Sequence, residues 1–423
     1  MTRTQLDTPF LDGGIRSTNF FNGRLLSRED MQREQDAERA VHERLGRALG
    51  AGIAYGLEVE AKAIGGNSAA DPVVTVHAGL AINRRGQTVA LDRDVDVSLL
   101  KPAAPATSTT SAAGAFATCL PPDNAVYVTG TGVYLLAVAP ASQKQGLAVV
   151  SGLNNTAAAC NAKEVVAGVQ FHLTQVKLTS AELADDAHLR NAVAYKFFAA
   201  EGAGTDAVRD PFGVPPSPVA LTDPPLSDCD VPLGVFQWTA AGGLRWVDLW
   251  SVRRRPAGPD SDAWPMFPGA RPDAVGEAML RQFQHHIGSL RDASALPTRA
   301  SDVFRSLPPA GLVPLGGIAG AVGVDAARFF DGFTTRGPVF VEGARVPAFL
   351  RLATRFPPIR VGDPELVWLY LVRENRQPVA GVVPRQPYLI FALGRLPYQA
   401  APRFDVSHWD FANYALDDER MSP

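Results

Sequence analysis

The sequence predicts a β-rich α+β protein with more than one domain. Most apolar residues fall in short runs, or alternate with polar residues, in the way that is typical of strands. Helical periodicity is confined to a few stretches, the first of which lies near the N-terminus. A length of 423 residues favours two or three domains over one. We therefore expect an N-terminal amphipathic helix that leads into antiparallel β domains.

The first predicted helix starts after Ser27 and ends before Gly50. Ser27 and Asp30 have the spacing of a helix-start pair, in which a hydroxyl accepts a hydrogen bond from the first turn. Because its apolar stripe is narrow and its other faces are charged, the helix can bury little of itself in its own domain. We expect it to lie along another chain or a second copy. The alternative is a solvated surface helix with a weakly apolar inner face. The stripe consists of Met31, Val41, Leu45, Ala48 and Leu49.

An aromatic pair, Phe20 and Phe21, precedes this helix at a turn formed by Asn22 and Gly23. Aromatic side chains contribute a large contact area, so the pair is a candidate anchor for a partner. The residues expected at a partner interface are Phe20, Phe21, Arg24, Met31, Val41, Leu45 and Leu49.

Several separated blocks extend over most of the chain, at residues 20–26, 52–59, 74–82, 231–255, 307–311 and 401–414. Together they resemble baseplate- and tail-associated proteins of phage-tail-like contractile injection systems. No block carries a chemical signature, because all consist of ordinary residue types. The resemblance implies a structural subunit at the baseplate or another tail end of such a particle. Its expected partners are baseplate, sheath, tube or spike proteins, and a homo-oligomer is an additional candidate.

Between the first helix and residue 100, alternating residues predict paired strands with a turn at residues 83–86. Asp92, Asp94 and Asp96 have a spacing reminiscent of a calcium loop, but the glycine and distal glutamate of such a loop do not follow. Apolar residues alternate with them, so they predict a solvated strand face.

The middle of the chain predicts strands separated by polar insertions. Residues 102–125 are rich in Ala, Pro, Thr and Ser and predict a flexible insertion. A strand at 126–138, dense enough to be buried on both faces, is followed by a polar insertion at 140–164. After a further strand, Thr179 and Glu182 predict the start of a second helix that continues to about residue 200.

A predicted hairpin at residues 232–252 carries Trp238, Trp246 and Trp250. Tryptophans on a strand face can bind sugars, which would suit a receptor-binding fibre or an adhesin that recognises a surface glycan. They more often belong to a core, where each buries a large area. We interpret them as core or subunit contacts and retain the glycan-binding module as the alternative function.

A proline-rich stretch at residues 256–272 predicts a linker and a domain boundary. The helix that follows, at about 273–290, has a clear apolar stripe. Two fully apolar runs, at 366–372 and 388–393, predict central strands of one sheet. The predicted domains are an N-terminal segment at 1–61, a β-rich domain at 62–255 and a C-terminal α+β domain at 273–423.

Composition and charge exclude several classes of protein. A formal net charge of −3 and a pI near 6.2 argue against a nucleic-acid partner, and the basic run at 253–255 is interpreted as a solvated strand end. Three cysteines without C-x-x-C spacing predict neither a disulfide framework nor a zinc site. No signal peptide or membrane-spanning run is evident. We expect synthesis and assembly in the cytoplasm without membrane insertion, and an extracellular location only as part of a released particle.

The sequence predicts no catalytic, cofactor or metal site. The G-x-S-x-G, H-E-x-x-H, Walker A and G-x-G-x-x-G motifs are absent. His285 and His286 diverge on one helix, and we expect His286 at a cap or an interface. The glycine-rich run at 316–323 lacks the Lys-Ser/Thr of a phosphate loop. The remaining alternative is an enzyme whose catalytic carboxylates lie far apart in sequence.

Overall fold

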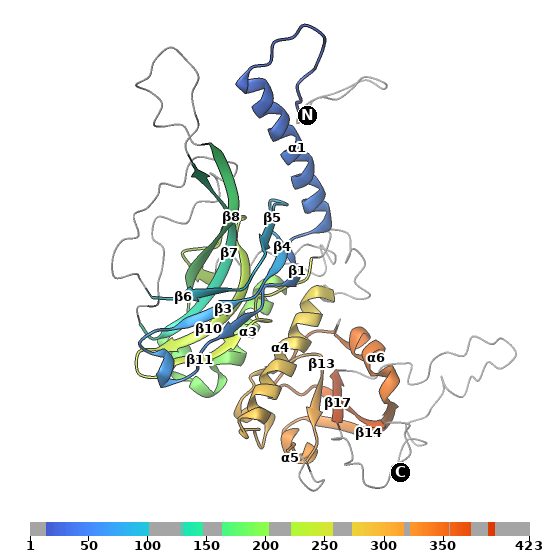
Figure 1. Cartoon of the computed structure of the whole chain (residues 1–423). Coiled ribbons are helices and arrows are strands. Elements are labelled where there is room, and N and C mark those ends of the chain that lie inside the picture. Colours follow the sequence, from blue (N-terminus) through green and yellow to red (C-terminus); the bar gives the residue numbers. More distant parts are fainter. Residues whose placement is uncertain are drawn as a thin grey trace, which may run out of the picture.

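The computed structural model describes residues 14–100, 128, 130–146, 163–202, 221–256, 273–316, 322–354, 356–373 and 388–393. Across these residues the chain forms six α-helices and 17 strands in several mostly antiparallel sheets. The predicted β-rich α+β class with more than one domain is therefore confirmed. Figure 1 shows the first helix, α1 (Arg28–Leu49), standing away from the β body to which its C-terminal end is attached.

Two small antiparallel sheets follow α1, with strand orders β1-β4-β5 and β2-β3-β6. Val74 and Val76 are fully buried in β3, as the alternation of the sequence predicts. The apolar faces of both sheets join one core with a larger sheet. The strands are β1 (Gly52–Gly56), β2 (Val59–Ala61), β3 (Val73–Val76), β4 (Gly79–Ile82), β5 (Thr88–Leu91) and β6 (Val95–Ser98), with a 3₁₀ turn η1 (Gly66–Ser68).

The predicted domain boundary at residue 61 is wrong. β1 pairs with β4, and β2 pairs with β3. The chain from Gly52 onward therefore belongs to the β body, and the N-terminal segment ends with α1. The sequence alone did not indicate that the β body begins at Gly52, because β1 and β2 are short and their partner strands come later in the chain.

The larger sheet has the order β11-β10-β7-β8-β9 and is buried on both faces at its centre. Tyr134 and Leu136 of β7 face the small sheets, while Val133 and Leu135 face helix α3. The prediction of a strand buried on both faces is thus confirmed. The elements are β7 (Gly132–Gln145), β8 (Glu164–Val176), α2 (Ser180–Ala184), α3 (Asp186–Gly202), β9 (Thr222–Asp223), β10 (Val231–Thr239) and β11 (Gly243–Asp248).

Two predicted boundaries in this region need correction. β7 continues to Gln145 and pairs with β8 along its whole polar end, so the insertion predicted at 140–164 begins too early. Backbone pairing, which does not depend on apolar side chains, extends this hairpin. The second helix starts at Thr179 with the predicted cap but breaks at Asp185, which has a non-helical backbone, and so forms α2 and α3.

The C-terminal part packs helix α4 against a four-stranded sheet of order β13-β17-β16-β14. Phe283 of α4 contacts Phe304 and Phe391, with both pairs of ring centroids 5.3 Å apart. β16 and β17 lie at the centre of the sheet, as predicted, and β14 pairs with β16 in parallel. The elements are α4 (Asp273–Asp292), η4 (Ala300–Asp302), β12 (Ser306–Leu307), β13 (Ala310–Pro314), α5 (Ala326–Phe329), β14 (Thr334–Glu342), η5 (Gly343–Arg345), α6 (Val346–Ala353), β15 (Ile359–Arg360), β16 (Leu366–Arg373) and β17 (Tyr388–Leu393).

A buried polar network joins the two parts where α3, β11 and α4 meet. The carboxylate of Asp248 is fully buried and accepts hydrogen bonds from Arg190 Nε at 2.8 Å and Gln282 Nε2 at 2.9 Å. Burial alone would raise the pKa of Asp248, but the charge and hydrogen bond of Arg190 hold it below its ordinary value. The junction therefore contains an ionised pair in its interior.

The basic run at 253–255 is not a solvated strand end. Arg253 is buried and donates hydrogen bonds to the backbone carbonyls of Leu57 at 3.1 Å and Gly56 at 2.5 Å. Arg254 lies over the ring of Phe198, 4.9 Å from its centroid. The run therefore ties the end of the β-rich part to its beginning, which a charge count along the sequence does not reveal.

The predicted insertion at 102–125, the linker at 256–272 and the aromatic tail at 404–414 lie outside the described residues. Cys229 is disulfide-bonded, which the odd cysteine count did not predict. The other two cysteines of the sequence also lie outside the described residues. Over the part of the chain that the structure describes, no helix is both long and apolar enough to cross a membrane.

Candidate functional site

The free end of α1 is organised by the predicted Ser27–Asp30 pair. Asp30 N–H donates to Ser27 Oγ at 3.2 Å, and the Asp30 carboxylate accepts from Ser27 N–H at 3.1 Å. Arg24 donates to the same carboxylate at 2.5 Å and to Asn19 O at 2.7 Å. These contacts, with the Ser27 backbone hydrogen bond as the largest cause, keep the pKa of Asp30 below its ordinary value. The loop before the helix is therefore held in one conformation.

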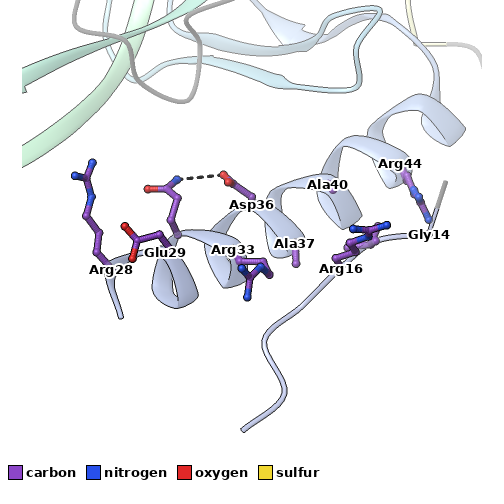
Figure 2. Close-up of a pocket in the computed structure, with 11 residues that line it drawn as sticks. Gly14, Arg16, Arg28, Glu29, Arg33, Asp36, Ala37, Ala40 and Arg44 are labelled. Atoms are coloured by element: carbon purple, nitrogen blue, oxygen red, sulfur yellow. Dashed lines mark hydrogen bonds between the residues drawn. The ribbon is translucent and has the colours of Figure 1, made fainter. Parts of the chain in front are cut away.

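The chain before this loop runs back along one face of α1. Thr18 N–H donates to Glu34 Oε2 at 3.0 Å, and Thr18 Oγ1 donates to Asp30 O at 2.8 Å. This segment covers Ala37 and forms a groove of about 750 Å³ with the helix. Figure 2 shows Arg16, Arg33 and Arg44 on the side of the helix along which the segment runs. The groove is lined by arginines mixed with Glu29 and Asp36, so it has no set of converging acids that would suit catalysis.

The C-terminal end of α1 is attached to the turn between β4 and β5. A Cβ atom at Gly46 would overlap the carbonyl oxygen of Gly86, and one at Gly86 would overlap the carbonyl oxygen of Glu43. Gly86 has a φ of +84°, which glycine adopts without strain. Gln87 Nε2 also donates to Glu43 Oε1 at 3.0 Å. The close glycine contact sets the position from which α1 projects.

The close contact between Gly46 and Gly86 predicts that Gly46→Ala destabilises α1, the opposite of the usual effect of Gly→Ala in a helix. Gly→Ala inside a helix ordinarily stabilises by roughly 0.5–1 kcal/mol. Gly46→Ala should instead loosen α1, because the added methyl group forces the helix away from Gly86 at a cost of about 1–3 kcal/mol. We expect amide hydrogen exchange in the second half of α1 to become roughly tenfold faster. Gly288→Ala in α4 is the matched control, because a Cβ there meets no atom within 4 Å, and it should stabilise. Slower exchange in Gly46→Ala would contradict the close contact.

The apolar stripe of α1 faces solvent. Leu45 and Leu49 are 59% and 62% exposed, and Met31 and Val41 are close to half exposed. The buried positions of the helix are Asp30, Ala37 and Gly46 instead. The stripe is therefore not the face by which α1 contacts the rest of its own chain, and the small buried face fits the alternative of a solvated surface helix as well.

Six of the seven predicted interface residues thus lie on the exposed surface of the loop and helix, and only Arg24 is occupied by contacts within its own loop. The predicted set omits the exposed apolar residues Leu25, Leu26 and Tyr55. Leu25 and Leu26 come soon after the aromatic pair, in the same loop, and could have been included for that reason. Tyr55 lies in β1, where no local pattern marks it as exposed.

The other candidate residues are used within the fold. Asp94 precedes β6 and Asp96 lies in it; both are exposed, as predicted, and pair with His77 and Lys62. His286 lies in the middle of α4, buried against the ring of the core residue Phe304, so it is not at a helix cap. In the described ranges no three His, Cys, Asp or Glu side chains come together in a way that could hold a metal ion. Part of the glycine-rich run at 316–323 lies outside these ranges.

The hairpin tryptophans pack against the fold. Trp238 is buried, Trp246 packs against the core that includes α3, and Trp250 has the guanidinium groups of Arg253 and Arg281 near its ring. This placement matches the interpretation as core.

No protein-family model matches this sequence, and no curated protein is significantly similar to it. The candidate site is therefore defined by its geometry.

The surface formed by Phe20, Phe21, Leu25, Leu26, Met31, Val41, Leu45 and Leu49 is called the α1 surface below. Monomeric proteins rarely expose a contiguous apolar patch larger than a few hundred Å² without a use for it. The α1 surface is suited to contact with another polypeptide, and its residue types offer no group that would act on a small molecule.

Proposed function

We propose that this protein is a non-enzymatic structural or assembly subunit that docks through the α1 surface. The observation that carries the proposal is the orientation of α1. The helix projects from the β body (Figure 1). Its apolar stripe is exposed to solvent, and its buried positions are Asp30, Ala37 and Gly46, which are small or polar. An amphipathic helix with an uncovered apolar face is a common element of helix-to-groove and helix-to-helix recognition.

The energetics require several residues of this surface to act together. Full burial of a Leu, Met or Phe side chain contributes roughly 1.5–3 kcal/mol, so each half-exposed side chain adds about 1 kcal/mol when a partner covers it. Association costs about 4–15 kcal/mol in lost translational and rotational freedom. A single contact cannot offset this cost, whereas eight side chains provide a gain of the same order. Substitution of several stripe residues is therefore the appropriate test.

The context proposed for this docking is a phage-tail-like contractile injection particle, with the subunit at the baseplate or another tail end. Its support is the resemblance of the sequence blocks described above. The proposed partners are baseplate, sheath, tube or spike proteins. Such a subunit would be made in the cytoplasm and would reach the outside of the cell as part of a released particle.

The decisive experiment replaces Met31, Val41 and Leu45 together by Asp. All three side chains are exposed, so the purified variant should keep the circular dichroism spectrum and melting temperature of the wild type. It should nevertheless be absent from purified particles, because three charges on the stripe prevent its burial. Particle composition is measured by mass spectrometry after gradient purification. Normal incorporation of this variant would refute the docking role.

A matched control carries Asp substitutions on the other exposed faces of the same helix, at Gln32 and Arg47, which change the net charge by the same amount as the triple variant. It has a comparable helix propensity and also a more negative charge, but it leaves the stripe intact. We expect its incorporation to equal that of the wild type. Loss of both variants from the particle would mean that charge alone, and not the stripe, decides assembly.

A further inference from the structure

The face of α1 that carries Met31, Leu45 and Leu49 of the stripe has polar residues at its centre. At 100° per residue, the side chains of Met31, Glu38, His42, Leu45 and Leu49 fall within about 60° of one another on one face. Glu38 and His42 are exposed, and among the described residues neither makes a hydrogen bond or an ion pair. The face therefore has an acid and an imidazole side by side, with apolar groups beyond them in both directions.

This pattern is self-complementary in only one orientation. When two copies of α1 lie antiparallel and centred on Ala40, residues equally distant from Ala40 are opposite one another. Glu38 then lies opposite His42 of the second copy and Met31 opposite Leu49, while Leu45 lies opposite Gln35. Two-fold symmetry repeats these contacts. In a parallel pair, Glu38 would lie opposite Glu38, and like charges at the same level destabilise a helix pair.

The two ends of the α1 surface fit the same arrangement. At the free end of the helix, the loop exposes Phe20, Phe21, Leu25 and Leu26. At the attached end, Leu49 and Tyr55 are 62% and 64% exposed. Antiparallel pairing brings the loop of each copy to the attached end of the other, so both exposed ends are covered. The free end of α1 projects from the β body (Figure 1), whereas His42, Leu45 and Leu49 near the attached end line a pocket of about 440 Å³ together with Ile82 and Thr88.

We infer that α1 pairs with α1 of a second copy of this chain, antiparallel and centred on Ala40, with Glu38 of each copy paired to His42 of the other. The inference rests on the proposed function and names the partner of its docking surface. The apolar ends supply the affinity, and the two central hydrogen bonds between Glu38 and His42 select the orientation and the register.

Charge exchange at the centre tests this pairing in the purified full-length chain. Glu38→Arg removes the acceptor opposite His42 and puts a second donor there, and His42→Glu places two carboxylates opposite one another, so each variant should dimerise about tenfold more weakly than the wild type in sedimentation equilibrium. The double variant Glu38→Arg/His42→Glu should recover the wild-type dissociation constant, because it places a guanidinium opposite a carboxylate on both copies. Both positions are exposed, and circular dichroism checks that each variant is folded.

Three results would overturn the inference: a wild type that stays monomeric at all concentrations, a double variant no tighter than the single variants, or single variants as tight as the wild type. A parallel pair would leave the double variant weak, so the rescue is specific to the antiparallel register.

The outcome of this test is separate from that of the docking experiment. If the wild type is monomeric while the triple Asp variant is missing from particles, self-pairing fails and docking stands. If the wild type pairs while that variant is incorporated, docking fails and self-pairing stands.

Discussion

Asp248→Ala is expected to lower the free energy of unfolding by about 3–5 kcal/mol, because it leaves the guanidinium of Arg190 buried without its counter-charge. Asp248 is fully buried and accepts hydrogen bonds from Arg190 on α3, Gln282 on α4 and both N and Oγ of Ser251. Asp248→Ala therefore removes the carboxylate that accepts hydrogen bonds from α3, from α4 and from the turn after β11. Urea unfolding followed by tryptophan fluorescence measures the loss.

Two further variants separate the buried charge from other causes. Asp331 forms an exposed pair with Arg299, so Asp331→Ala should cost less than about 1 kcal/mol. The double variant Arg190→Met/Asp248→Leu should recover only the part of the loss that comes from the unpaired guanidinium, because the buried donors of Gln282 and Ser251 still lack their acceptor. A loss below about 1 kcal/mol for Asp248→Ala would show that water reaches the pair and that the junction is not closed.

The second large effect is a loss of stability in acid that depends on His286. Burial, with a smaller contribution from the charge of Arg190, lowers the pKa of His286 to about 3 in the folded protein. Asp248 acts in the opposite direction, and His285 adds to the decrease. In the unfolded chain the pKa is about 6.5. Between these two values the unfolded state binds a proton that the folded state does not bind, so stability falls as the pH falls below about 6.5.

The expected loss from this residue between pH 7 and pH 5 is about 2 kcal/mol, since one pH unit in this window corresponds to about 1.4 kcal/mol. His286→Phe should lack this part of the pH dependence, because a phenyl ring keeps the contact with Phe304 but cannot bind a proton. Other titrating groups are common to both proteins and cancel in the comparison. His286→Leu replaces the Phe variant if the larger ring impairs folding. Parallel stability curves for wild type and variant from pH 7 to pH 5 would contradict the buried, neutral state of His286.

Much of the fold follows from short-range signals. The helix-start pair at Ser27 and Asp30 and the glycine at position 50 specify both ends of α1, because caps bond to the backbone within one turn. Apolar density marked β16 and β17 as central strands, because a strand covered on both faces has no polar side. The candidate site was also largely predictable, since a narrow stripe on a charged helix indicates an element that its own domain does not bury.

Only the tertiary structure decided which side of α1 is covered. The β body holds the helix at Gly46, against Gly86, and thereby turns Met31, Leu45 and Leu49 to solvent. Nothing within one turn of Gly46 indicates this contact.

The other corrections also concern contacts between residues that are far apart in the sequence. Arg253 was interpreted as a solvated charge but bonds to the carbonyls of Gly56 and Leu57, and Asp248 pairs with Arg190. By itself, then, the sequence determined the elements and the presence of an uncovered stripe, because those signals act between neighbours along the chain. The burial of charges and the direction in which the stripe faces were decided by the fold, because they depend on residues that become neighbours only when distant segments pack together.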